Sequence, residues 1–329
     1  MVEEFKQERD WLPVAILLTL LACLFAAIQI GDLARMLPML AIIAPWSAAM
    51  VILLLVASLF RMARAREPRP LASGIAVIRN NWRSLLVAGV ILLVAGLNLV
   101  SFMWIKPILN TIVPFRADPL LANVDHVLFL GRDPWRLAQF ANFPGAGYIY
   151  HPLWFGTVIV ALLAATFAPA SPERSAVLLS YFVLWTLFAP LVHALLPAAG
   201  PVFFGLLGHG DRFAALPYTA ETREVASYLW SFYENGDYGT GNGISAMLSM
   251  HVTTSTWVLI ATWVCARNYV PLACIAYLVI AVMSVALGWH YAVDGVVGAA
   301  GAIGIFLVLR NIFRKRLSAP LAAPTPLTA

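Results

Sequence analysis

Apolar side chains occur in long runs along this chain, separated by short polar segments and by segments rich in glycine and proline. A helix needs about 20 mostly apolar residues to cross the hydrocarbon core of a bilayer, which is roughly 30 Å thick. Runs of this kind lie near residues 12–30, 37–60, 85–104, 150–169, 176–198, 246–266, 270–288 and 295–312. The pattern therefore predicts an all-α, polytopic membrane helix bundle with about eight transmembrane helices.

The composition agrees with a membrane protein. Hydrophobic residues make up 61% of the chain and charged residues only 11%, whereas soluble domains carry about 25% charged residues. No small-residue cleavage site follows the first apolar run, so we expect it to be a retained span and not a signal peptide. The three cysteines lie inside apolar runs, which indicates neither a disulfide framework nor a metal site.

Basic residues gather in two places, between the second and third apolar runs and in the tail after the last run. By the positive-inside rule both places are cytoplasmic. An even number of spans then puts both termini in the cytoplasm and residues 105–149, 199–245 and 289–294 outside. A nucleic-acid partner is not expected, because these charges flank spans and do not form a basic face of a folded domain.

Three regions follow from this arrangement. Residues 1–104 form an N-terminal membrane section with an arginine-rich cytoplasmic loop and almost no polar chemistry inside its helices. Residues 105–312 form the domain expected to carry function, with external segments at 105–149 and 199–245. Within the first of these, residues 120–128 are predicted to form a short helix on the membrane surface. Residues 313–329 are predicted to be a basic and then disordered cytoplasmic tail.

The first candidate site lies where the last two apolar runs meet. His290 and Asp294 are four residues apart, so they share a face if the backbone there is helical. A carboxylate that binds one imidazole nitrogen raises the basicity of the other, as a nucleophilic histidine requires. The alternative interpretation is an interfacial histidine next to an aspartate that caps the last helix.

A second histidine stands at another such boundary. A glycine-rich segment that ends at Gly243 is followed by Ser245, Ser249 and His251 at the predicted start of a helix. Free N–H groups and the helix dipole attract an anion to such a position. His251 would lie close enough to give a proton to a group that leaves the anion. Together the two boundaries predict phosphoryl chemistry on the external side.

These motifs resemble those of the type 2 phosphatidic acid phosphatase superfamily. The segment Leu248-Ser-Met-His251 is similar to its second motif, with leucine where proline is usual, and Gly288-Trp-His-Tyr-Ala-Val-Asp294 is similar to its third. The resemblance implies a six-helix phosphatase-like core and the family's roles for three residues. His290 would attack phosphorus, Asp294 would orient it, and His251 would protonate the leaving group, without metal or other cofactor.

Two arginines of the family pattern are missing. Ser284 stands where the third motif normally has arginine, and the best candidate for the first motif, Lys106 with Val113-Pro114, lacks its arginine. The branch that includes fungal inositol phosphorylceramide synthase also lacks the third-motif arginine, and this chain resembles that branch more closely. The external segments Asp118–Asp125 and Asp133–Trp135 also look like those of its bacterial members.

The missing arginines favour a particular substrate class. A phosphate monoester is close to a dianion, whereas a phosphodiester carries one charge and needs fewer cations. We therefore expect transfer of a phospho-head-group between lipids, with Lys106 and the helix start at Ser245 and Ser249 binding the phosphate. Arg116 or Arg212, or alternatively Arg132 or Arg136, would restore a monoester site if loop folding brought one of them there.

The prediction is thus an inositolphosphotransferase-like enzyme in the bacterial inner membrane, acting on a lipid phosphate at the periplasmic or outer face. The alternative within the same chemistry is a phosphatase for phosphatidate or undecaprenyl pyrophosphate. Alternatives of other classes are a lipid transporter, a non-catalytic scaffold, and a metal site built from His251, His290 and Asp294. His151 and His193 are expected to bond neighbouring helices, and Asn98 to bond a backbone group or a neighbouring helix. The glycines at 295–304 are expected to allow close helix packing.

Overall fold

The computed structural model describes residues 8–239 and 241–318, and every regular element within these ranges is helical. The longer elements are α2 (Leu12–Ile30), α3 (Leu33–Leu40), α4 (Ile43–Arg64), α5 (Pro70–Ile112), α6 (Asp118–Leu128), α7 (Pro134–Ala138), α8 (Ala146–Phe167), α9 (Pro172–Val183), α10 (Ala189–Leu195), α11 (Ala220–Asn235), α12 (Met250–Cys265), α13 (Val270–Ala286) and α14 (Ala292–Ser318). Short helical turns lie at η1 (Gln139–Ala141), η2 (Leu184–Phe188), η3 (Pro201–Phe203) and η4 (Arg267–Tyr269). The all-α bundle predicted from the sequence is confirmed.

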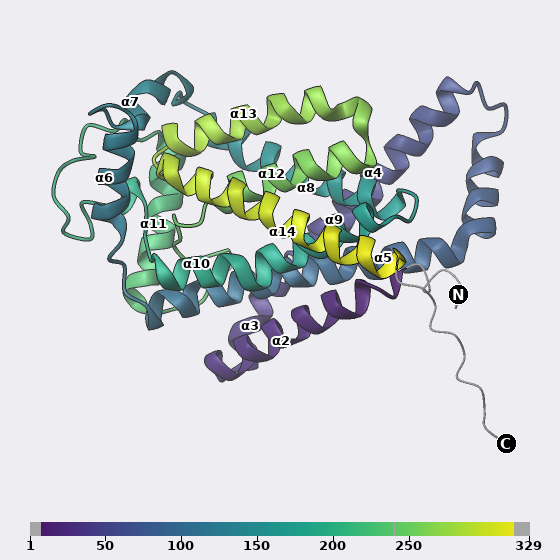
Figure 1. Cartoon of the computed structure of the whole chain (residues 1–329), viewed down its shortest axis with the longest axis horizontal. Coiled ribbons are helices and arrows are strands. Elements are labelled where there is room, and N and C mark those ends of the chain that lie inside the picture. The colour runs from purple at the N-terminus through teal and green to yellow at the C-terminus, as the bar shows by residue number, and fades with distance from the viewer. Residues whose placement is uncertain (1–7, 240, 319–329) are drawn as a thin grey trace.

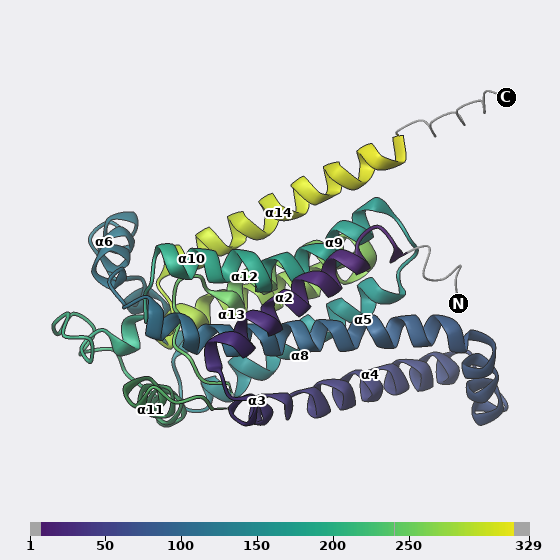
Figure 2. The same cartoon turned by 90° about the horizontal axis from the view of Figure 1, so that it is seen from below.

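Seven helices in the described part of the chain are long and apolar enough to cross a membrane. The eighth predicted span, near 246–266, is the exception, because its first residues are not helical and α12 is only 16 residues long. Helix α12 instead occupies the middle of the bundle, packed against α8, α9, α13 and α14 (Figures 1 and 2). Its neighbours are therefore mainly other helices and not lipid. A helix in this position can be shorter than one that faces the bilayer.

Two helices also differ from their predicted bounds. Helix α5 runs for 43 residues, with a local break at Asn81, and continues to Ile112. Lys106 therefore lies inside a helix and not in an external loop that begins at residue 105. The span Pro172–Leu195 is interrupted by the π turn η2, which joins α9 to α10 without ending the span.

The N-terminal section contains more buried polar chemistry than the sequence indicated. Arg174 on α9 binds both carboxylate oxygens of Glu8 at 2.9 and 3.0 Å, and both side chains are buried. The prediction for Asn98 is confirmed, since its amide nitrogen donates to Thr19 at 3.1 Å and to Thr186 at 2.6 Å. A buried polar group of this kind needs such partners, and here they tie α2 and α5 to the rest of the bundle.

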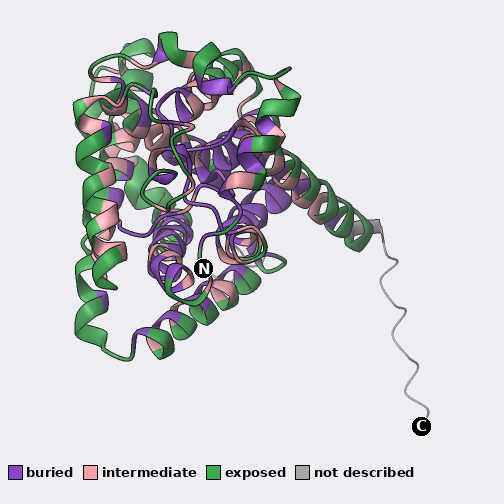
Figure 3. Ribbon diagram, turned by 90° about the vertical axis from the view of Figure 1, so that its left-hand side faces the viewer, coloured by how far each residue is buried: buried purple, intermediate pink, exposed green. Residues whose placement is uncertain are grey.

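The two ends of the bundle differ. The described start and end of the chain and the connection between α4 and α5 lie at one end, whereas α6, α7 and α11 lie at the other (Figure 1). Seen from the α6 end, buried residues fill the centre and exposed residues cover the outer helices (Figure 3). Many exposed side chains on those helices are large and apolar, for example Leu17, Ile52 and Leu278, as expected of surfaces that face lipid.

Two further predictions concern the segments around the site. The short helix predicted for residues 120–128 is confirmed as α6 (Asp118–Leu128), and its place on the membrane surface stays a prediction. The glycines of α14 allow close packing as expected, because a Cβ atom on Gly298 would meet Thr253 of α12 and one on Gly301 would meet Phe188 of the π turn. Helix α14 is thereby held directly against α12, and their adjacent N-terminal ends carry the two histidine motifs.

Candidate active site

The turn between α13 and α14 directs His290 into the protein. Gly288 has φ +76°, and a Cβ atom there would meet Leu216, so glycine is required in this turn. The backbone N–H of His290 donates to the carbonyl of Ser284 at 3.2 Å. The side chain of His290 is buried, although it belongs to a connection between helices. The turn therefore presents an imidazole to the interior of the bundle.

One nitrogen of His290 is fixed by a backbone carbonyl. Nδ1 lies 2.8 Å from the carbonyl oxygen of Ala246 and 3.7 Å from Oδ2 of Asp294. A carbonyl only accepts hydrogen bonds, so Nδ1 carries the hydrogen and Nε2 has a free lone pair in the neutral ring. Ala246 therefore makes the short hydrogen bond to His290, and the carboxylate of Asp294, predicted to orient this ring, lies just beyond it as an ion-pair partner.

Asp294 combines the two interpretations that the sequence left open. It is the third residue of α14, and its Oδ2 accepts the backbone N–H of Tyr291 at 2.9 Å, which is the geometry of a capping box. The side chain is fully buried, and Oδ1 has no hydrogen-bond partner among the described residues. A carboxylate in this position both caps α14 and favours positive charge on the His290 ring.

His251 lies beside His290 although the two are distant in sequence. Ser249 caps α12 by accepting the N–H of Val252 at 3.4 Å, and His251 is the second residue of that helix. The ring centroids of His251 and His290 are 5.8 Å apart. The structure therefore brings together the three residues predicted to be catalytic, His290, Asp294 and His251.

A third histidine joins this pair. Nδ1 of His151, near the start of α8, lies 3.2 Å from Nε2 of His251. Two other α8 side chains contact the same ring: Tyr150 stacks on it at 4.6 Å, and Trp154 lies at 4.4 Å. The sequence predicted only a bond between His151 and a neighbouring helix. Its position at the start of a span, on the same side as the two motifs, was the available signal.

Four of the predicted phosphate-binding residues lie where the segment that precedes α12 passes α5. They are Lys106, Gly243, Ser245 and Ser249. Gly243 has φ +92°, and a Cβ atom there would come 2.8 Å from the nitrogen of Pro107 and 3.1 Å from Cε of Lys106. Only glycine lets the segment pass so close to α5. Lys106 lies within electrostatic range of His151, His193 and His251.

The two serines of this junction already have partners. The hydroxyl of Ser245 lies 3.0 Å from Nδ1 of His193 and donates to the carbonyl of Met247 at 3.2 Å. Ser249 uses its hydroxyl to cap α12. The prediction for His193 is confirmed, since it also lies 3.3 Å from the amide nitrogen of Asn110 on α5. Both serines therefore shape the start of α12, whose N–H groups lie beside the histidines.

Two of the four arginines proposed as replacements, Arg212 and Arg116, have other surroundings. Arg212 donates to Asp133 at 2.6 and 3.1 Å, to Asn123 at 2.8 Å and to the carbonyl of Ala122 at 2.8 Å. Its guanidinium thus holds the second external segment against α6. Arg116 is exposed, and its backbone N–H donates to the carbonyl of Pro197. Neither guanidinium has a contact with the histidines within the described residues.

Two aspartates of α6, which the sequence did not assign to any role, brace the His290 turn from outside. Asp118 accepts the hydroxyl of Tyr291 at 2.9 Å and two backbone N–H groups of the second external segment. Asp125 accepts the N–H groups of Ala292 and Val293 at 2.7 and 2.9 Å. Burial raises the pKa of Asp118, and it raises the pKa of Asp125 to about 6.

The raised pKa of Asp125 predicts a pH dependence of stability. The folded protein holds this proton more tightly than the unfolded chain, so the contribution is complete below about pH 4 and is lost as the pH rises through about 6. We expect the melting temperature of wild type minus that of Asp125→Asn to be larger at about pH 4.5 than at about pH 7.5. Thermal unfolding of both proteins in detergent measures this difference; a value independent of pH would contradict the assignment.

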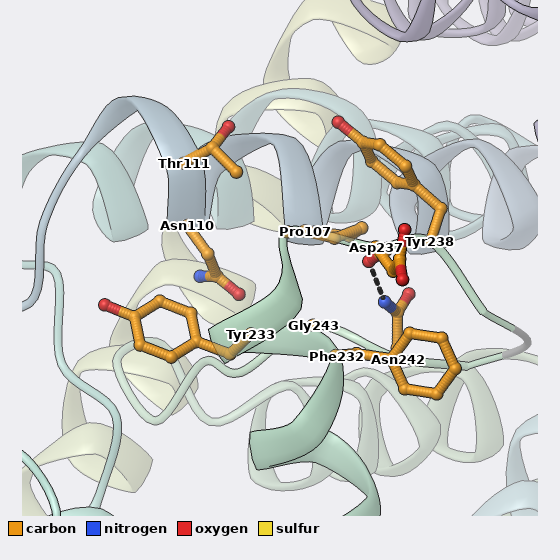
Figure 4. A pocket seen from close by; sticks show the side chains of 10 residues that line it. Pro107, Asn110, Thr111, Phe232, Tyr233, Asp237, Tyr238, Asn242 and Gly243 are labelled. Atoms are coloured by element: carbon orange, nitrogen blue, oxygen red, sulfur yellow. Dashed lines mark hydrogen bonds between the residues drawn. The ribbon is translucent and has the colours of Figure 1, made fainter.

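A narrow pocket lies beside Gly243, between the end of α5, α11 and residues 236–238 and 242–243 (Figure 4). Asn242 is buried, donates to the backbone carbonyl of Asp237 at 2.9 Å, and has no partner for Oδ1 among the described residues. Asp237 also pairs with Arg35 of α3 at 3.2 Å. The pocket is lined by Pro107, Asn110, Thr111, Phe232, Tyr233, Gly236, Asp237, Tyr238, Asn242 and Gly243.

The alternative of a metal site has no support from the geometry. The described ranges hold no group of three or more His, Cys, Asp or Glu side chains that could bind a metal ion.

Comparison with known proteins gives one match. The family model described as the PAP2 superfamily matches residues 121–308. This region includes α8, both histidine motifs and the α6 aspartate Asp125. No curated protein and no solved structure matches the chain.

Proposed function

The chain belongs to the PAP2 superfamily, and from that membership we propose that it is a lipid phosphotransferase acting through a phosphohistidine on His290. Membership of this superfamily, together with the seven long apolar helices, indicates a membrane enzyme of the phosphatase type. One observation supports the finer proposal most directly. His290 has its Nδ1 bound by Ala246 and its Nε2 free, with the ring of His251 only 5.8 Å away.

The reaction has two steps. Nε2 of His290 attacks phosphorus, the bond from phosphorus to the leaving oxygen breaks, and His251 gives its proton to that oxygen. An acceptor hydroxyl then gives its proton to His251 as its oxygen attacks phosphorus, and the bond from phosphorus to nitrogen breaks. The electron pair of that bond returns to His290. Asp294 stabilises the positive charge that His290 carries in the intermediate.

The cations near the histidines favour a phosphodiester. Lys106 lies within electrostatic range of His151 and His251, whereas the position normally held by arginine in the third motif is the uncharged Ser284. A single ammonium and the free N–H groups at the start of α12 suit a phosphate with one negative charge. A monoester dianion would require more positive charge than these groups supply.

The pocket beside Gly243 is consistent with an acceptor that carries hydroxyl groups. Its lining includes the polar residues Asn242, Asp237, Tyr233 and Tyr238. None of the lining residues is basic, so a phosphate is not its natural occupant. Hydroxyl-rich head groups make hydrogen bonds with amide and carboxylate oxygens of this kind.

The proposed location is the bacterial inner membrane with the site facing outward. The arginine-rich connection between α4 and α5 lies at the same end of the bundle as the described chain ends, opposite α6 and α11 (Figure 2). Placing that connection in the cytoplasm by the positive-inside rule puts the histidines at the periplasmic or outer surface.

Transfer is tested with purified protein and a panel of lipid phosphodiesters and monoesters in mixed micelles. We expect a phosphorylated acceptor lipid to form from a diester donor at least about tenfold faster than inorganic phosphate is released from any monoester, because the site supplies charge for one negative phosphate. Faster phosphate release from phosphatidate or undecaprenyl pyrophosphate would instead establish the phosphatase alternative. A protein without turnover or phosphohistidine on any lipid would be a scaffold or a transporter.

A further inference from the structure

The ring of His251 is surrounded mainly by one helix, α8, which has no role in the mechanism above. His151 meets Nε2 of His251 at 3.2 Å, and the rings of Tyr150 and Trp154 contact its imidazole at 4.6 and 4.4 Å. Trp154 is itself fixed, because its indole N–H donates to Thr254 on α12 at 2.7 Å. Helix α8 therefore determines the orientation of the His251 ring.

The two nitrogens of His251 are in different situations. Nε2 is held by His151, whereas Nδ1 has no hydrogen-bond partner in residues 8–239 and 241–318. His290 has the opposite arrangement, with Nδ1 held by the carbonyl of Ala246 and Nε2 free. Each member of the reacting pair thus has one nitrogen fixed by the protein and one available to the substrate.

This arrangement meets a requirement of general acid catalysis. To protonate a leaving group through Nδ1, His251 must be an imidazolium, and both of its nitrogens then carry hydrogen. The Nε2–H lies in a partly buried contact and needs an acceptor, since a charged donor without a partner is costly away from water. Of the other titratable groups around this ring, Lys106 has no lone pair as an ammonium, the Nε2 lone pair of His290 attacks phosphorus, and Tyr150 stacks on the ring face. The Nδ1 lone pair of neutral His151 can accept this hydrogen.

We infer that His151 is a positioning residue for the general acid of this enzyme, accepting the Nε2–H of His251 so that the Nδ1–H is directed at the leaving oxygen. The inference rests on the proposed phosphoryl transfer. When the leaving group departs, the bond from Nδ1 to hydrogen breaks, the proton moves to the oxygen, and the electron pair stays on Nδ1. His151 keeps its own proton on Nε2 throughout.

The test compares leaving groups. An alkoxide needs a proton as it leaves, whereas p-nitrophenolate does not, so a defect in general acid catalysis affects the first far more. We expect His151→Leu to lower the first-turnover rate with an alkyl phosphodiester about 10- to 100-fold, and with the p-nitrophenyl analogue less than about threefold. His251→Ala should show the same asymmetry with a larger loss on the alkyl substrate.

Two further variants separate positioning from packing. His151→Asn keeps a hydrogen-bonding atom near the position of Nδ1 and should recover the alkyl rate to within about tenfold of wild type. Tyr148→Phe, on the same helix with its side chain 72% exposed, should match wild type on both substrates. Equal losses on the two substrates in His151→Leu, with no recovery in His151→Asn, would overturn the inference. Failure of the wild type to form phosphohistidine would overturn the proposed function instead.

Discussion

His290→Ala is expected to lower turnover by a factor on the order of 10⁴ or more on every lipid that the wild type uses. The variant has no Nε2, so the bond from nitrogen to phosphorus cannot form, and direct attack by the acceptor would have to cross a much higher barrier. Labelling from a lipid with radioactive phosphorus, quenched in alkali to preserve phosphohistidine, measures the intermediate directly. Wild type should retain label and His290→Ala should not.

A matched control comes from a histidine outside the cluster. His126 on α6 is about half exposed and lies 3.5 Å from Asp133, so His126→Ala should label and turn over like wild type. Label that persists in His290→Ala would place the covalent intermediate on another side chain, and His251 would be the first to replace in turn. If the wild type turns over lipid but retains no label, the reaction is a direct displacement.

Asp294→Asn is expected to lower turnover about 10²- to 10³-fold while leaving the thermal stability close to wild type. The amide oxygen of asparagine can still accept the N–H of Tyr291, so the capping of α14 survives, but the negative charge beside His290 is lost. The loss should be smaller than the roughly 10⁴-fold seen when a triad aspartate itself fixes the tautomer, because here the carbonyl of Ala246 fixes it.

Asp294→Ala separates the two roles of this carboxylate. It should lose as much activity as Asp294→Asn. Because the helix cap is also lost, its free energy of unfolding should fall by about 1 kcal/mol. Steady-state rates with the best lipid donor, together with melting temperatures in the same detergent, report both effects. Near-normal turnover in Asp294→Asn would reduce Asp294 to a helix cap.

The sequence predicted where the histidines meet because the motifs lie at the ends of apolar runs. The alternation of spans puts residues 243–251 and 288–294 on one side of the membrane, whatever the exact bounds of each helix. The structure agrees, with His251 and His290 5.8 Å apart. Span counting is robust in this way because a bilayer fixes the length of a crossing helix.

The partners of those histidines could not be predicted in the same way. The carbonyl of Ala246 is available in any sequence, so nothing in the residue type reveals that it binds His290. His151 is about 100 residues from His251, and only the packing of α8 against α12 brings them together. Arg212 was a reasonable phosphate ligand by charge alone, and the fold instead uses its donors on Asp133 and Asn123.

The exact ends of two helices could not be predicted for a different reason. The hydropathy of residues 246–266 suits a span, but the turn that seats Ser245 and Ala246 beside the histidines takes the first residues of that run out of the helix. In α5 the helix continues past the apolar run, which places Lys106 within the helix and next to Gly243. In both places the departures from a regular span lie where the candidate site is built.

The contacts that α3 and α5 make with the segment around Gly243 bear on how much of this chain an engineer would have to transplant. The region matched by the family begins at residue 121, yet Lys106, Asn110 and the sulfur of Met39, which accepts the N–H of Gly241 at 3.1 Å, all precede it. A chimera that borrowed only the matched region would leave its glycine segment without these supports. The smallest portable unit therefore begins no later than α3, and grafts between relatives should exchange α3 through α14 as one piece.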